Sequence, residues 1–237
     1  ILYFHRTQQP PADAVAAQEL EKEITRRRNV EYNQGIGDRS RPVPYQWYDF
    51  QPAGRIVNVL HALWFLSELD CIAAAEAEEL AAMIDGHARI IDWQEAVLPA
   101  KPGNHQALRG LALLYAGSFL DNRQYLETGI RLADYHIQND FCSDGLLHEA
   151  SPTYHCFETW IARDCCYLAR LYDFPLQPAS FAMLSQAAAA AAMICRPDGR
   201  AVVLNDGCNL TLATFLRTLP QAAEAMTEHM LLSVNRI

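Results

Sequence analysis

Apolar residues recur every three to four positions along most of the chain, the spacing that places them on one face of an α-helix. The segment 56–69 shows the pattern clearly, with apolar side chains at Ile56, Val59, Leu60, Leu63 and Leu66. The same pattern and helix-favouring composition predict further helices over 12–32, 73–96, 106–120, 124–137, 152–172, 179–195 and, as one helix or two, 212–232. We therefore expect about eight to eleven helices in all.

Glycine, proline and short polar runs separate these helices. They predict a loop over 35–44, a break at 99–103, a tight turn at 121–123, a loop over 139–151 and a turn at 197–199. Ser151 stands where an N-cap belongs, and Pro152 follows at the first helical position. "RAVVLND", from Arg200 to Asp206, is the one segment typical of a β-strand.

Consecutive helices with short links form a bundle, a solenoid or an α/α toroid. No exact repeat recurs at a fixed period, but the pairing of long helices favours an arrayed architecture. We predict an all-α fold, an incomplete (α/α) toroid of antiparallel helical hairpins, with at most a short strand near residues 200–205. The toroid is expected to occupy residues 1–195, and residues 196–237 to form a C-terminal extension that begins a β-rich domain.

Composition and charge narrow the function. Of the 237 residues, 51% are apolar and 20% are charged, as in an ordinary globular protein. A net charge of −9 argues against nucleic acid as the main partner, because binding phosphates requires a basic face. It leaves room for an anionic sugar bound in a locally basic cleft. No apolar run reaches the ~18 residues that a membrane-spanning helix needs.

The cysteines and the first residues bear on the compartment. Seven cysteines, with Cys165 and Cys166 adjacent and no CxxC pair, are typical of buried thiols in a reducing compartment rather than of a disulfide framework or a zinc ribbon. The chain opens with neither methionine nor a signal-peptide pattern. We expect that a leader has been removed or that the chain begins inside a longer protein.

Three segments gather polar residues where the apolar pattern stops. The first is "PGNHQALRG" (102–110), in which Asn104 occupies an N-cap position and His105 points away from the helix start. The second is "DGLLHEASPTYH" (144–155), and the third is "RPDGRAVVLNDG" (196–207). The first two segments also have an ordinary structural interpretation: Asn104 as a helix cap, and Tyr154 as a packed amphipathic side chain.

The second segment matches neither a zinc protease nor a serine hydrolase. A zincin needs two histidines one turn apart on one helix, whereas His148 and His155 are separated by Ser151 and Pro152. A nucleophilic serine needs a strand, a tight turn with flanking glycines and a helix, and "EASPT" has no glycine.

Taken together, the three segments resemble the heparinase II/III and oligoalginate lyase group of polysaccharide lyases. "YDFQPAGR" before the helix at Ile56 is also similar to that group, and the resemblance covers residues 45–210 with order and spacing preserved. It implies an N-terminal α/α toroid followed by β-sandwich domains, and an enzyme that cleaves uronate-containing polysaccharide by β-elimination. It further implies roles for particular side chains: Asn104 and His105 on the substrate uronate, Tyr154 as the catalytic tyrosine, and His155, Glu149, Arg55 and Trp47 in substrate binding.

The chemistry gives these residue types a reason. β-Elimination removes the weakly acidic C5 proton and builds negative charge on the uronate carboxylate. Hydrogen bonds from Asn104 and from a cationic or donor His105 would stabilise that charge, and two helix N-termini would add partial positive charge. A tyrosine such as Tyr154 can protonate the leaving oxygen or, as phenolate, take the C5 proton.

The chain departs from the family pattern at its end. It stops at Ile237 without a run of β-strands, so we expect a fragment of a longer lyase or a shortened relative with an incomplete catalytic set. No cofactor is expected in this chain, and any structural divalent metal would belong to the β-rich domain. The family resemblance favours a periplasmic or secreted protein, whereas the cysteine usage favours the cytoplasm.

Two further functions stay open at this point. One is a non-catalytic carbohydrate-binding or exopolysaccharide-assembly accessory module, which a gene that ends at Ile237 would favour. The other is a purely structural helical scaffold, which predicts no polar cluster at one mouth of the fold. Basic residues such as Arg55, Lys101 and Arg109 are scattered, which favours an unsulfated polysaccharide over a sulfated one.

Overall fold

A computed structural model describes residues 50–97 and 99–219. These residues are helical apart from loops and isolated β-bridges, so the predicted all-α class is confirmed. The helices are α3 (Gln51–Glu68), α4 (Ala74–Val97), α5 (Asn104–Leu120), α6 (Arg123–Asn139), α7 (Pro152–Tyr172), α8 (Pro178–Met193) and α9 (Leu212–Leu216). Within the described residues, no helix is both long and apolar enough to span a membrane.

The described residues divide into two compact units. Unit 1 contains those before residue 100 together with Leu108–Gly129, and unit 2 contains Ala100–Ala107 together with those from residue 130 onward. Helices α5 and α6 therefore contribute to both units. The first turn of α5 and the second half of α6 lie in unit 2, with α7, α8 and α9.

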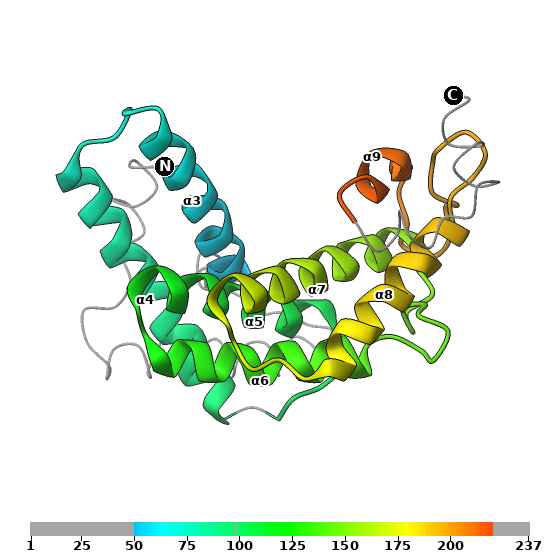
Figure 1. Cartoon of the computed structure of the whole chain (residues 1–237), viewed down its shortest axis with the longest axis horizontal. Coiled ribbons are helices and arrows are strands. Elements are labelled where there is room, and N and C mark those ends of the chain that lie inside the picture. Colours follow the sequence, from blue (N-terminus) through cyan, green and yellow to red (C-terminus); the bar gives the residue numbers. More distant parts are fainter. Residues whose placement is uncertain (1–49, 98, 220–237) are drawn as a thin grey trace, which may run out of the picture. The chain divides into compact units, whose positions relative to one another are not determined.

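Unit 1 contains two helical hairpins. Helices α3 and α4 pack against one another and run in opposite directions (Figure 1). Helices α5 and α6 approach closely at two glycines: a Cβ on Gly117 would lie 2.8 Å from Leu126 Cγ, and a Cβ on Gly129 would lie 3.0 Å from Leu114 Cγ. Such pairs are the building blocks of the toroid that the sequence predicts.

Unit 2 is built on the pair α7 and α8. Ser151 caps α7 as predicted, because its backbone is extended and its Oγ accepts the Tyr154 N–H at 3.5 Å. Helix α7 ends at Asp173, whose φ of 56° is left-handed. Helix α8 packs against α7 and α9, and small side chains let its neighbours approach closely: Ala187, Ala188, Ala190, Ala191 and Ala192 are all buried.

Among the described residues of unit 2, apolar side chains pack into a larger and a smaller cluster. The larger joins α7, α8 and α9 and also takes in Ala201 from the segment between α8 and α9. The smaller contains Phe141, Leu147 and Ala187, with Tyr154 and Met183 packed against it. The loop after α6 is thereby fixed to α8 and to the first turn of α7. The predicted domain boundary at residue 195 stays a prediction.

Several boundaries differ from expectation. The short strand expected near residues 200–205 does not form, because this segment makes isolated bridges at Arg200 and Ala201 and then turns at Asn205, whose φ is 49°. Residues 202–204 are exposed. The predicted helix over 12–32, the loop over 35–44 and the residues beyond 219 lie outside the described residues, so the expected number of helices stays a prediction.

Candidate functional site

The first polar segment forms the start of α5, in unit 2. The first helical hydrogen bond runs from the Ala107 N–H to the Gly103 carbonyl at 3.3 Å, so Gly103 occupies the cap position. Asn104, expected at the cap, is instead the first helical residue, and its side chain is buried. His105 follows in the same turn and is half-buried.

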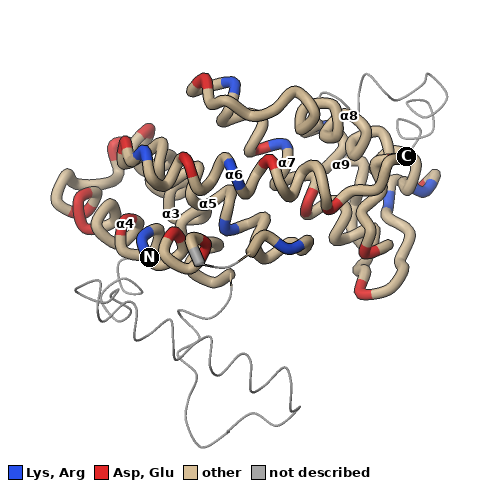
Figure 2. Tube along the Cα trace, turned by 90° about the horizontal axis from the view of Figure 1, so that it is seen from below, with Lys and Arg blue, Asp and Glu red and all other residues tan. Residues whose placement is uncertain are grey.

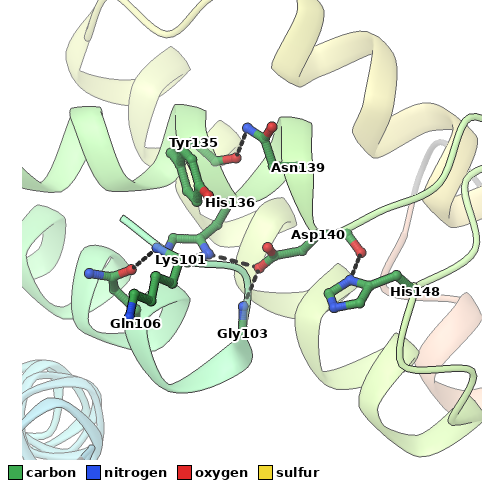
Figure 3. A network of polar contacts seen from close by, with 8 residues as sticks. All are labelled: Lys101, Gly103, Gln106, Tyr135, His136, Asn139, Asp140 and His148. Carbon is green, nitrogen blue, oxygen red and sulfur yellow. Dashed lines mark hydrogen bonds and ion pairs between the residues drawn. The ribbon is translucent and has the colours of Figure 1, made fainter. Parts of the chain in front are cut away.

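The N–H groups ahead of α5 are taken by side chains (Figure 3). Gln106 accepts the Lys101 N–H at 2.9 Å through its Oε1. A capping box would direct such a side chain to the N–H of the cap residue itself. Here the Gly103 N–H is bound at 3.3 Å by Oδ2 of Asp140, which lies 37 residues further along the chain.

Asp140 directly follows α6 and is fully buried. Its Oδ2 also accepts a hydrogen bond from Nδ1 of His136 at 2.8 Å, one turn earlier. Its carbonyl oxygen accepts two hydrogen bonds from His148, one from Nδ1 at 2.7 Å and one from the backbone N–H at 3.1 Å. Figure 3 shows Asp140 between Gly103 and His148, so this residue joins the start of α5 to the second polar segment.

The second polar segment is held in a tight loop against α8. Gly145 has a φ of 84°, and a Cβ there would lie 2.4 Å from the backbone oxygen of Gln186. Asp144 stabilises the turn, because its Oδ1 accepts the Leu146 N–H at 3.0 Å. Ala150 also has a positive φ, 53°, immediately before the cap of α7. The loop geometry therefore determines where α7 begins.

Tyr154 and His155 share the first turn of α7 but have different surroundings. Tyr154 is half-buried against the smaller apolar cluster. His155 is buried; its Nδ1 accepts the Leu147 N–H at 3.2 Å, and its Nε2 donates to the Ala187 carbonyl at 3.0 Å. Burial lowers the pKa of His155 from 6.5 to about 4. This histidine connects the loop to α8, and a substrate contact through its ring would require one of these bonds to break.

The third polar segment contacts the second. No periodicity in the sequence indicated this contact. Nδ2 of Asn205 donates to the Ala150 carbonyl at 3.0 Å and lies 3.4 Å from that of Glu149. The Cys208 N–H donates to Oγ1 of Thr153 at 2.8 Å. The segment from residue 205 to 208 therefore fixes the residues on either side of the α7 cap. Glu149 itself is exposed.

Two buried acidic residues, Asp140 and Glu158, lie next to one another in unit 2. Glu158 on α7 is buried, and its side chain is hydrogen-bonded to Asp140. Burial, and then the charge of Asp140 and this hydrogen bond, raise the pKa of Glu158 well above its usual value of 4.5, and Glu149 adds to the effect. Asp140 Oδ1 and Glu158 Oε1 receive no hydrogen bond from an N–H or hydroxyl donor of the protein. A proton held by Glu158 accounts for the hydrogen bond between the two side chains.

The two remaining predicted site residues are not placed with this group. Arg55 lies on α3 in unit 1, where its Nε donates to Nε2 of His87 at 2.9 Å, and burial lowers its pKa to about 10. Trp47 lies outside the described residues. Their roles in substrate binding stay predictions, as do those of the residues in unit 2.

Comparison with known proteins places these segments in a family. The chain matches the family model described as heparinase II/III N-terminus over residues 39–233. No curated protein and no solved structure gives a significant match. The match contains the three polar segments and every helix described above. The chain therefore belongs to the heparinase II/III family, of which it contains the N-terminal domain.

Proposed function

We propose that this protein is a polysaccharide lyase that cleaves uronate-containing polysaccharide by β-elimination, with Asn104, His105 and Tyr154 at the reacting sugar. Family membership supports a polysaccharide as the substrate. The observation that carries the proposal is the joining of two distant segments: Asp140 binds Gly103, beside Asn104, and His148, in the loop that leads to Tyr154.

The proposed reaction breaks the C5–H bond and the bond from C4 to the leaving oxygen. The electron pair of the C5–H bond becomes the C4–C5 double bond, and the leaving oxygen gains one proton. Tyr154 moves this proton: as phenolate it takes the proton from C5, and as phenol it returns it to the leaving oxygen. The tyrosine then ends the cycle as it began, with no proton gained or lost.

Asn104 and His105 would stabilise the charge that develops on the uronate carboxylate. Both belong to the first turn of α5, where backbone N–H groups and the helix dipole favour an anion. Donors held in place before the reaction stabilise the transition state most, because no reorganisation is required as the charge forms. The burial of Asn104 and the hydrogen bond that holds Gly103 support this role for Asn104.

We prefer an unsulfated polymer as the substrate class, because the described basic residues are scattered along the sequence. Figure 2 shows Lys and Arg at separate places along the chain. Several are engaged with carboxylates of the protein: Arg109 with Glu95, Arg163 with Asp164, and Arg196 with Asp198. Sulfate recognition would require several basic groups directed at one place.

The product gives a direct test. A C4–C5 double bond conjugated to the carboxylate absorbs in the near ultraviolet, so the protein in its full encoded length can be assayed on purified unsulfated and sulfated uronate polymers. We expect absorbance to rise on an unsulfated polymer and to rise more slowly on a sulfated one. Tight binding without absorbance on every polymer would refute the lyase and favour the carbohydrate-binding accessory module.

A further inference from the structure

We propose that Asp140 is the positioning residue of this site: its carboxylate caps α5 from the end of α6, and its backbone carbonyl holds the loop that leads to α7. The inference rests on the proposed function for its catalytic consequence. Its structural part, the cap itself, can be tested separately.

The cap follows from the contacts of one carboxylate. Oδ2 of Asp140 binds the N–H of Gly103, the cap residue of α5, from 37 residues away. A negative charge at this end of a helix is favoured by the helix dipole and by the unpaired N–H groups. The backbone of the same residue binds His148, so a movement of Asp140 would displace both polar segments together.

Side chains of two helices contact the carboxylate of Asp140. His136 of α6 binds Oδ2, and Glu158 of α7 faces the carboxylate. Glu149 of the loop adds negative charge near Glu158. Two buried carboxylates in contact cannot both be ionised without a large cost, so one proton remains between them. With that proton on Glu158, its hydroxyl donates a hydrogen bond to the carboxylate of Asp140.

Helix α6 offers a matched control in Asp134. Its Oδ1 binds the N–H of Gln177, the cap residue of α8, at 3.0 Å and the Ser180 hydroxyl at 2.6 Å. Asp134 therefore makes the same kind of cap in the same unit, but the helix start that it holds carries none of the proposed catalytic residues.

The experiment compares Asp140→Asn with Asp134→Asn in the full-length protein, on the unsulfated polymer cleaved by the wild type. We expect Asp140→Asn to lower kcat about 10- to 100-fold with a smaller change in KM, because misplaced groups lose contacts made in the transition state. Asp134→Asn should change kcat by less than about twofold. Equal kcat values for the two variants would overturn the positioning role.

A second pair of variants covers a failure of Asp140→Asn to fold. Glu158→Gln keeps a donor toward Asp140, whereas Glu158→Leu removes it. Glu158→Gln should retain at least about tenfold more kcat than Glu158→Leu, since only the latter removes the donor that residue 158 directs at Asp140. A Glu158→Gln enzyme as impaired as Glu158→Leu would overturn the assigned proton.

Amide hydrogen exchange separates this inference from the proposed function. Asp140→Asn should accelerate exchange in residues 103–107 at least tenfold, and Asp134→Asn should leave exchange there unchanged. If the wild type cleaves no polymer, the proposed function fails, and the exchange result alone decides whether Asp140 caps α5. Unchanged exchange in Asp140→Asn would overturn the cap whatever the activity.

Discussion

Two helix starts in unit 2 are capped in the same way but differ in what they carry. Helix α5 is capped by Asp140 and helix α8 by Asp134, and in each case a carboxylate binds the N–H of the cap residue. Asp134 is half-buried, whereas Asp140 is fully buried and shares a hydrogen bond with Glu158. A half-buried carboxylate suffices to hold a helix in place. Burying the carboxylate of Asp140 costs more desolvation free energy, and Asp140 caps the helix whose first turn carries Asn104 and His105.

From this difference we infer that the contacts at the start of α5 fix the positions of its residues and do not serve stability alone. Burying a charge and a neutral acid beside it stabilises a protein less than apolar packing of the same volume. What it provides is a fixed geometry, because Oδ2 of Asp140 accepts hydrogen bonds from both the Gly103 N–H and the His136 ring. Variants at the two helix starts test whether they differ in chemistry as they do in burial.

The largest difference in kcat/KM is expected between Asn104→Ala at the start of α5 and Ser180→Ala at the start of α8. Loss of a donor to the developing charge should lower kcat/KM about 10²- to 10³-fold for Asn104→Ala. Ser180→Ala loses a hydrogen bond to Asp134 and should cost about 1 kcal/mol of unfolding free energy with unchanged kcat/KM. Steady-state kinetics and urea denaturation measure the two effects, and comparable kinetic losses would contradict the distinction.

A smaller effect, on stability, is expected where the second polar segment meets α8. Gly145→Ala would place a Cβ 2.4 Å from a backbone oxygen of α8 and would strain a φ of 84°. We expect a loss of about 2–4 kcal/mol in the free energy of unfolding. Gly54→Ala in α3 is the control: no atom lies within 4 Å of its Cβ, so it should be neutral or stabilising by up to about 1 kcal/mol. Similar urea midpoints for both variants would show that the loop is not seated on α8.

The smallest expected effect is on how the free energy of unfolding depends on pH. In the folded state Glu158 keeps a proton that the unfolded chain loses above 4.5, while His155, with a pKa of about 4, lacks a proton that the unfolded chain holds below 6.5. Between 4.5 and 6.5 the two contributions to stability cancel. Above 6.5 only Glu158 acts, so stability should fall with rising pH, by at most about 1.4 kcal/mol per pH unit.

Glu158→Gln removes one of these contributions and should change the shape of the profile. The variant should gain stability as the pH rises from 4 to 6.5, where His155 acts alone, and should then lose the decline seen in the wild type. Urea denaturation at several pH values gives the difference between variant and wild type, in which other titrating groups cancel. Parallel profiles would mean that Glu158 is ionised in the folded protein.

The sequence predicted what depends on neighbours along the chain. Ser151 and Pro152 determine the start of α7 through local capping chemistry, and the predicted bounds of that helix are confirmed. The three polar segments were found because they interrupt an apolar period. The hairpins followed from helix length and short links.

What the sequence did not reveal depends on contacts between distant residues. Asn104 looked like a cap, but Asp140 binds the N–H of Gly103 from another helix, so Gly103 takes the cap position. The strand expected near residues 200–205 has β-branched residues but no partner strand in the described residues, and Asn205 instead binds the loop before α7. Nothing in the local sequence distinguishes Asp134 or Asp140 from a surface aspartate.

The most direct test of the central claim is the rate of near-ultraviolet absorbance from Tyr154→Phe on an unsulfated uronate polymer, beside the wild type. Tyr167→Phe, an exposed tyrosine of the same helix, is the control. We predict that Tyr154→Phe binds uronate oligosaccharide as the wild type does but loses about 10²- to 10⁴-fold in kcat, because only the proton-transferring hydroxyl is removed. Tyr167→Phe should match the wild type. Turnover by Tyr154→Phe at the wild-type rate would contradict the account.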